Sequence, residues 1–225
     1  MKFGGKMVYE PLLVPVWFYS YSSVVYAVTA LVSFLISYFS FRLYKMSLLN
    51  MNLMMMLTFV FMGVAFSVLA ATSYYTYMSS NSFKLYENLY GVVKYGFMGY
   101  YTLSLVAYIL LTVMYLPRKF REKLFVAYMP LWYLDFTAFH IISAVLVGYI
   151  VIMNLVNFMK KRKIDSLLVL LAFVMIELSH VMMMLTQFDA VLYLVAHAFL
   201  AVGFASLLAM LIRVNYPQLK LVGFP

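Results

Sequence analysis

The sequence predicts an all-α fold, a polytopic integral membrane bundle of six transmembrane helices. Of its 225 residues, 67% are hydrophobic and only 10% are charged, whereas about 25% of the residues of a soluble domain are charged. The apolar runs are long and do not alternate with polar residues, which favours membrane helices over a transmembrane barrel. No soluble domain of useful size remains, so the function must lie in or beside the bilayer.

Each predicted span ends where charged residues, a polar loop or proline interrupt an apolar run. The first run is longer than the roughly 20 residues that cross a bilayer, and Pro11 and Pro15 mark its start. Residues 124–135 extend another run, and we expect them to lie at the membrane interface. The six predicted spans are residues 12–41, 53–74, 91–116, 136–159, 166–185 and 190–212.

The two halves of the chain, residues 1–117 and 118–225, resemble each other weakly. Pro15 and Trp17 near the first span match Pro130 and Trp132 near the fourth, and these are the only tryptophans in the chain. Each Pro-x-Trp motif is followed by a long span that ends at a basic residue. Because each half has three spans, an odd number, a repeat would place the second half upside down, as in many secondary transporters.

The formal net charge of +9 comes from basic residues between the spans, which indicates contact with the lipid bilayer rather than with nucleic acid. Six alternating spans would place both termini on one side, with Lys160 and Lys163, and would place Arg42 and Lys45 on the other. The charge bias weakly favours a multi-pass protein of the cell membrane with cytoplasmic termini. The absence of cysteine excludes disulfides, thiolate metal sites and iron–sulfur clusters.

The candidate site consists of the three histidines and one glutamate of the second half. His140, His180 and His197 lie on three consecutive predicted spans, and Glu177 is one helical turn from His180. With a rise of about 1.5 Å per residue, His180 and His197 lie at equal depth and His140 about one turn closer to the membrane surface. We therefore expect these side chains to meet near a tight turn at residues 186–189. Ionisable groups inside a bilayer are costly and usually functional.

Several chemistries fit these residues, and the sequence leaves them open. The leading hypothesis is a metal- or haem-binding module for redox chemistry or sensing. His180 and His197 would ligate haem b or a divalent metal, with His140 as a third ligand and Glu177 as a hydrogen-bonding neighbour of the ligands or a proton acceptor. A metal-free cluster would suit a proton-coupled transporter or a ligand-binding sensor. Inert packing, or a structural subunit of a larger membrane complex or homo-oligomer, also agrees with the composition. The sequence leaves open whether the protein is an enzyme.

Overall fold

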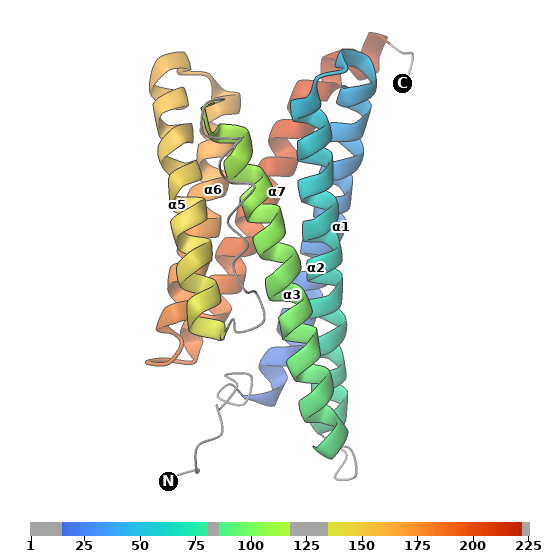
Figure 1. The fold of residues 1–225 in the computed structure, drawn as a ribbon, viewed down its shortest axis with the longest axis vertical. Helices are drawn as coiled ribbons and strands as arrows, with labels where there is room; N and C mark the ends of the chain where they lie inside the picture. Colours follow the sequence, from blue (N-terminus) through green and yellow to red (C-terminus); the bar gives the residue numbers. More distant parts are fainter. Residues whose placement is uncertain (1–14, 81–85, 118–134, 222–225) are drawn as a thin grey trace.

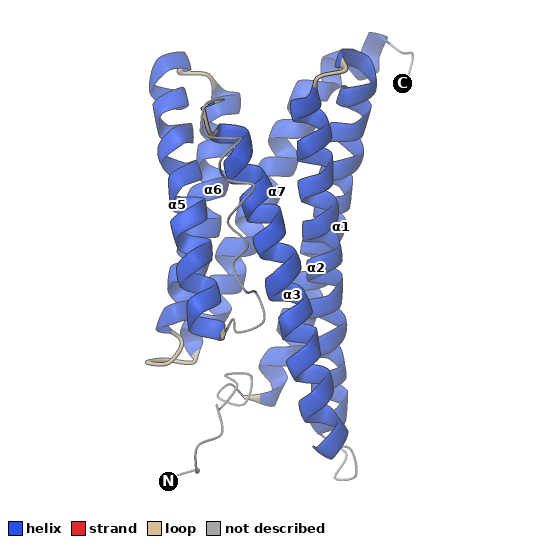
Figure 2. Ribbon diagram, in the orientation of Figure 1, coloured by secondary structure: helices blue, strands red, loops and turns tan. Residues whose placement is uncertain are grey.

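The computed structural model describes residues 15–80, 86–117 and 135–221, and every long element in this part of the chain is a helix (Figures 1 and 2). Six helices are long and apolar enough to cross a membrane, which confirms the predicted class. They are α1 (Val16–Ser47), α2 (Asn50–Ser80), α3 (Tyr86–Tyr115), α5 (Phe136–Lys161), α6 (Ile164–Leu185) and α7 (Val191–Leu221).

Helices α3 and α5 run in the same direction. The ring of Tyr101 stacks on Phe139 with centroids 4.4 Å apart, and the Tyr115 hydroxyl donates a hydrogen bond to Asn154 Oδ1 over 3.2 Å. Residue numbers rise together along the two helices, so α3 and α5 are parallel, as Figure 1 also shows.

Helices α1 and α7 are parallel as well. Phe18 stacks on Tyr193, and Tyr26 contacts His197 further along both helices. Consequently α1, α3, α5 and α7 all begin at one end of the bundle.

These directions correct the sequence prediction. The second half runs in the same sense as the first, so the two halves are not inverted relative to each other. The prediction assumed that every connection between spans reverses the chain, but α3 ends at the opposite end of the bundle from the start of α5. An internal repeat stays a prediction. Most of the expected interfacial segment 124–135 lies outside the described residues, as do Pro130 and Trp132.

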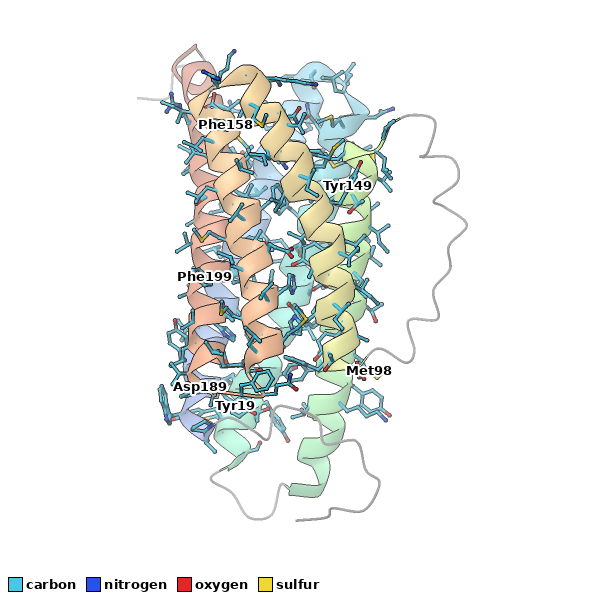
Figure 3. The ribbon with its side chains drawn as sticks, turned by 90° about the vertical axis from the view of Figure 1, so that its left-hand side faces the viewer. Tyr19, Met98, Tyr149, Phe158, Asp189 and Phe199 are labelled. Atoms are coloured by element: carbon cyan, nitrogen blue, oxygen red, sulfur yellow. The ribbon has the colours of Figure 1, made fainter. Side chains whose placement is uncertain are left out.

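The turn from α1 to α2 and the turn from α5 to α6 lie at the same end, which we call the basic end. Its described basic residues are Arg42, Lys45, Lys160, Lys161, Arg162, Lys163 and Arg213. The opposite end, which we call the histidine end, carries the α6–α7 turn. In Figure 3, Phe158 lies near the basic end, and Met98 and Asp189 lie toward the histidine end. The sequence had assigned Lys45 and Lys160 to opposite sides, and the parallel arrangement corrects this.

Local sequence explains where several helices begin and end. Asp135 caps α5 by accepting a hydrogen bond from the backbone nitrogen of Ala138 over 2.7 Å, and Asp189 accepts one from Val191 at the start of α7. Both carboxylates satisfy an amide that has no partner within its helix. At the basic end, Leu48 and Arg162 take left-handed backbone angles and end α1 and α5.

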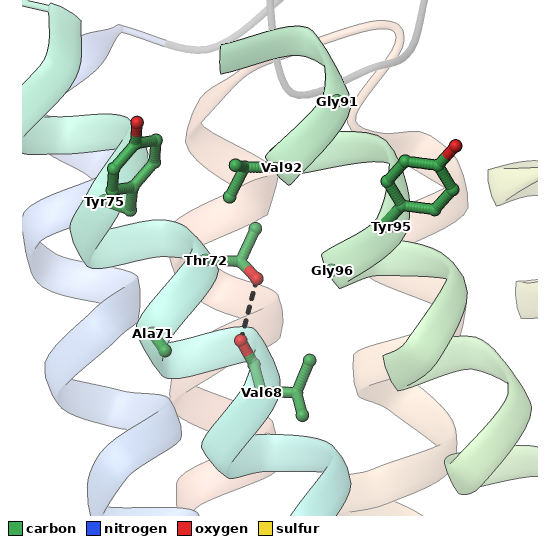
Figure 4. Close-up of a pocket in the computed structure, with 8 residues that line it drawn as sticks. All are labelled: Val68, Ala71, Thr72, Tyr75, Gly91, Val92, Tyr95 and Gly96. Carbon is green, nitrogen blue, oxygen red and sulfur yellow. Dashed lines mark hydrogen bonds between the residues drawn. The ribbon is translucent and has the colours of Figure 1, made fainter. Parts of the chain in front are cut away.

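Small residues set the closest approaches between helices. Gly203 of α7 lies against α6, where an added Cβ would be 2.8 Å from Ile176 Cγ1 and 2.9 Å from the Ala172 carbonyl oxygen. Gly96 of α3 likewise faces the Thr72 side chain of α2, beside an open groove between the two helices (Figure 4). Such contacts let helix backbones pack closely in a membrane.

We expect Gly203→Ala to destabilise the folded protein by roughly 1–3 kcal/mol, because a backbone oxygen cannot move aside for the new methyl group. Thermal unfolding in detergent would measure this loss. Gly91→Ala is the matched control, since an added Cβ at Gly91 would meet nothing within 4 Å. Equal melting temperatures for the two variants would contradict the close crossing of α6 and α7.

Candidate functional site

A chain of hydrogen bonds links three helices inside the histidine-end half of the bundle. His180 Nε2 of α6 lies 2.8 Å from the Tyr108 hydroxyl of α3. On the other side of the ring, His180 Nδ1 lies 2.9 Å from His140 Nδ1 of α5. All three side chains are buried. Both ring nitrogens of His180 are therefore engaged, one by a phenol and one by a second imidazole.

The helix directions bring these groups together. Side chains lean toward the N-terminus of their own helix, so His180 leans toward the basic end and Tyr108 toward the histidine end. Tyr101 and Phe139 are in contact, which places Tyr108 about two turns nearer the basic end than His140. The long phenol spans this difference in level, because it points from α3 toward the ring of His180.

The hydrogen bonds among Tyr108, His180 and His140 can run in either of two directions. In the first, the Tyr108 hydroxyl donates to His180 Nε2, and His180 Nδ1–H donates to His140 Nδ1. In the second, His140 Nδ1–H donates to His180 Nδ1, and His180 Nε2–H donates to the Tyr108 oxygen. A neutral imidazole has one donor and one acceptor nitrogen, so both arrangements satisfy it. Entry of one proton at Tyr108 and loss of one proton from His140 Nε2 convert the first arrangement into the second, and the reverse exchange restores the first.

A small cavity adjoins the two paired histidines. Its volume is about 30 Å³, enough for one or two water molecules and about tenfold below the pockets that take drug-sized ligands. Polar side chains line it together with aromatic rings, and the residues with a nitrogen or hydroxyl group are Tyr26, Tyr100, Tyr101, His140, Ser179, His180 and Tyr193. A water molecule in this space would have several hydrogen-bonding partners.

His197 lies at about the depth of His180, as the sequence predicts. The ion pair of Arg213 and Asp165, with Nε and Oδ1 3.0 Å apart, aligns α7 with α6, and both histidines are about 16 residues from this level. The ring of His197, however, packs against Tyr26 and Tyr193, with centroids 4.7 and 4.3 Å away.

The hydrogen bonding of His197 defines its tautomer. Its Nδ1 lies 2.6 Å from the Tyr193 carbonyl oxygen, which can only accept, so Nδ1 carries the proton in the neutral ring. Nε2 is buried without a hydrogen-bond partner among the described residues. His197 thus presents one unused acceptor nitrogen in an aromatic surrounding.

Glu177 lies against α5 rather than between the histidines. Its carboxyl atoms are 3.8–4.0 Å from the position that a Cβ on Gly148 would take. The structure thus places the four predicted residues as one hydrogen-bonded pair, one separate histidine and one separate carboxyl group. In the described part of the chain, no group of three or more His, Cys, Asp or Glu residues is arranged to hold a metal ion. Ligation of haem or metal by His180 and His197 stays a prediction.

Tyr108 is the residue of the site that the sequence analysis missed. The signal that could have found it is a spacing of seven residues in α3, where Tyr101, Tyr108 and Tyr115 follow one another. Seven residues are close to two helical turns, so these phenols share the face that packs on α5. Trp17, from the predicted repeat motif, lies exposed beside Pro15 at the start of α1.

The fold and the site together define a class: a multi-pass helical membrane protein with a buried pair of hydrogen-bonded histidines. Comparison of the chain with protein-family models, with curated proteins and with solved structures finds no match. We therefore infer the function from the geometry of the buried residues alone.

Proposed function

We propose that this protein is a proton-coupled membrane transporter in which Tyr108, His180 and His140 form an intramembrane proton relay. The observation that carries the proposal is the unbroken pair of hydrogen bonds at 2.8 and 2.9 Å. Imidazole accepts and releases protons near neutral pH, and histidine chains inside membranes commonly serve as proton relays. The two hydrogen-bond directions are the states before and after a transfer.

The cavity supports the same function, since one or two water molecules in it would connect His140 with the histidine end of the bundle. His140 is only four residues from the start of α5, about 6 Å along the helix. The relay would thus exchange protons with the nearer membrane surface. Transport without a metal was an alternative that the sequence left open, and the geometry favours it.

We propose that the basic end faces the cytoplasm, because basic residues accumulate on the cytoplasmic side of membrane proteins. The histidine end, with Asp135 and Asp189, then faces away from the cytoplasm, and the relay lies in the outer half of the bilayer. Protons would enter from the outer surface. This orientation replaces the weaker expectation that both termini are cytoplasmic.

Reconstitution into vesicles that enclose a pH-sensitive dye tests the proposed function. We expect an imposed pH gradient to dissipate faster in vesicles with the protein than in protein-free vesicles. Tyr108→Phe should slow this flux at least about tenfold, since it removes the hydroxyl that is bonded to His180. Tyr115→Phe should leave the flux unchanged, although it removes a phenol from the same helix and breaks the hydrogen bond to Asn154.

Two outcomes would count against the relay. Vesicles with wild-type protein that leak protons no faster than empty ones, with or without candidate solutes, would exclude proton coupling. Equal flux in the Tyr108→Phe and Tyr115→Phe proteins would exclude the phenol from the path.

The hydrogen bond from His197 to Tyr193 favours a second candidate function, binding of haem or a divalent metal. Histidines that ligate metals usually donate from the other ring nitrogen to a carbonyl or carboxylate, as His197 Nδ1 does here. For His180 to be the second ligand, its ring would have to give up the bond to Tyr108 or to His140. Absorption spectra of oxidised and reduced protein, with elemental analysis, test this candidate, and a Soret band lost in His197→Ala would support it.

A further inference from the structure

Glu177 is the acidic residue nearest the relay among the described residues, and its side chain is half-buried. Among the described acidic residues, Asp135, Asp165 and Asp189 lie at helix starts or turns, whereas Glu177 lies in the middle of α6. Its Oε2 is buried and has no hydrogen-bond partner in the described part of the chain. An unpaired buried polar atom inside a membrane is costly, which indicates that Glu177 has a functional role.

Glu177 lies near the Tyr108 end of the relay. It shares a side of α6 with His180, three residues away, and the His180 ring is bonded to the Tyr108 hydroxyl of α3. The contacts of Tyr101 with Phe139 and of Tyr115 with Asn154 place Tyr108 at the level of residues 146–147 of α5, next to Gly148. From α5, the backbone at Gly148 approaches the carboxyl group. The groups around Glu177 that can carry a proton are therefore Tyr108 and, through it, His180.

The polar residues that continue from Tyr108 toward the basic end stop at Glu177. Nearer the basic end, Leu111 on α3 and Ile150 on α5 are buried, each about one helical turn before the bonded pair of Tyr115 and Asn154. On the side of the relay, Ser143 Oγ of α5 is another buried atom without a partner among the described residues. Unused polar atoms thus lie between the carboxyl group and the histidine pair, and apolar side chains lie beyond it.

We infer that Glu177 is the proton donor and acceptor at the Tyr108 end of the relay, with Gly148 leaving room beside the carboxyl group for a bridging water molecule. This inference rests on the proposed function. The relay then has two ends: His140 lies beside the cavity, and Glu177 lies on the side of the buried apolar residues Leu111 and Ile150.

The transfer starts from neutral rings and a protonated Glu177. The Glu177 proton passes through the bridging water to the Tyr108 oxygen while the Tyr108 proton moves to His180 Nε2. The proton on His180 Nδ1 moves to His140 Nδ1, and the proton on His140 Nε2 leaves to water in the cavity. Glu177 ends as a carboxylate, both rings stay neutral, and one proton has crossed the relay. The reverse sequence restores the first direction and moves a proton inward: a proton from the cavity water enters at His140 Nε2, and the Tyr108 proton returns through the bridging water to the Glu177 carboxylate.

Substitutions at Glu177 in the reconstituted protein test the inference. Glu177→Gln should reduce proton flux about a hundredfold or more, since it removes the proton-transferring group, and Glu177→Asp should restore a measurable part of the flux. Gly148→Leu should also lower the flux, because its side chain fills the space beside the carboxyl group. Asp189→Asn is the matched control: asparagine caps helices as well as aspartate does, and the flux should stay at the wild-type rate.

Infrared difference spectra distinguish proton transfer from a structural role. In wild-type protein, we expect the carbonyl stretch of a protonated carboxyl group to change between acidic and alkaline buffer and to be absent from Glu177→Gln. Wild-type flux in Glu177→Gln, while His180→Gln has lost its flux, would overturn this inference and leave the relay intact. Absence of flux in the wild-type protein would instead overturn the proposed function and the inference with it.

Discussion

We expect His180→Gln to lower proton flux in vesicles at least about a hundredfold. Glutamine can form hydrogen bonds at this position, but it cannot accept a proton on one atom and release another from a second atom. His180 is the central link, bonded at 2.8 Å to Tyr108 and at 2.9 Å to His140. No proton can pass between those two groups without it.

Two further measurements separate this loss from misfolding. His180→Ala leaves the Tyr108 hydroxyl and His140 Nδ1 without their partner, which should destabilise the protein by roughly 1–3 kcal/mol. Added imidazole can occupy the resulting cavity, and we expect it to restore part of the flux in His180→Ala but none in His180→Gln, where the space is filled. Wild-type flux in well-folded His180→Gln protein would refute the relay.

The orientation predicts an all-or-none labelling pattern. The chain has no cysteine, so single cysteines can be placed without any background reaction. In intact cells, an impermeant thiol reagent should label Gln187→Cys at the histidine end. The same reagent should label Leu49→Cys and Lys161→Cys at the basic end only after the membrane has been permeabilised. All three side chains are exposed.

The same labelling tests the helix directions independently of the orientation. Leu49 lies between α1 and α2, and Lys161 is the last residue of α5. Parallel α3 and α5 place these two positions at one end of the bundle, so they should react from the same side, whichever side that is. Labelling of Leu49→Cys and Lys161→Cys from opposite sides would contradict the fold and return the chain to six alternating spans.

The sequence predicts the helices well because apolar runs and their charged or proline stops are local features. Predicted spans at residues 136–159 and 166–185 became α5 at Phe136–Lys161 and α6 at Ile164–Leu185. The depth of His180 and His197 follows from counting residues along a helix, and it too was predictable. Helix direction across residues 118–134 was not, since it depends on tertiary contacts such as that of Tyr101 with Phe139.

The composition of the site was predictable only in part, because depth does not determine the direction of a side chain around its helix. His140 and His180 face each other, whereas His197, at the depth of His180, faces Tyr26 and Tyr193. Glu177 shares a side of α6 with His180 but contacts α5 at Gly148. Tyr108 belongs to the first half of the chain, and only the packing of α3 between α2 and α5 brings it to the histidines.

The most direct test of the relay is nitrogen NMR of protein labelled with ¹⁵N-histidine in lipid bilayers. We predict a through-bond coupling between one nitrogen of His140 and one of His180 across a shared N–H···N hydrogen bond, and a shift of the other His180 nitrogen in Tyr108→Phe. Two uncoupled imidazoles, or ring nitrogens with the signature of metal coordination, would contradict the hydrogen-bonded histidine pair and the proton relay built on it.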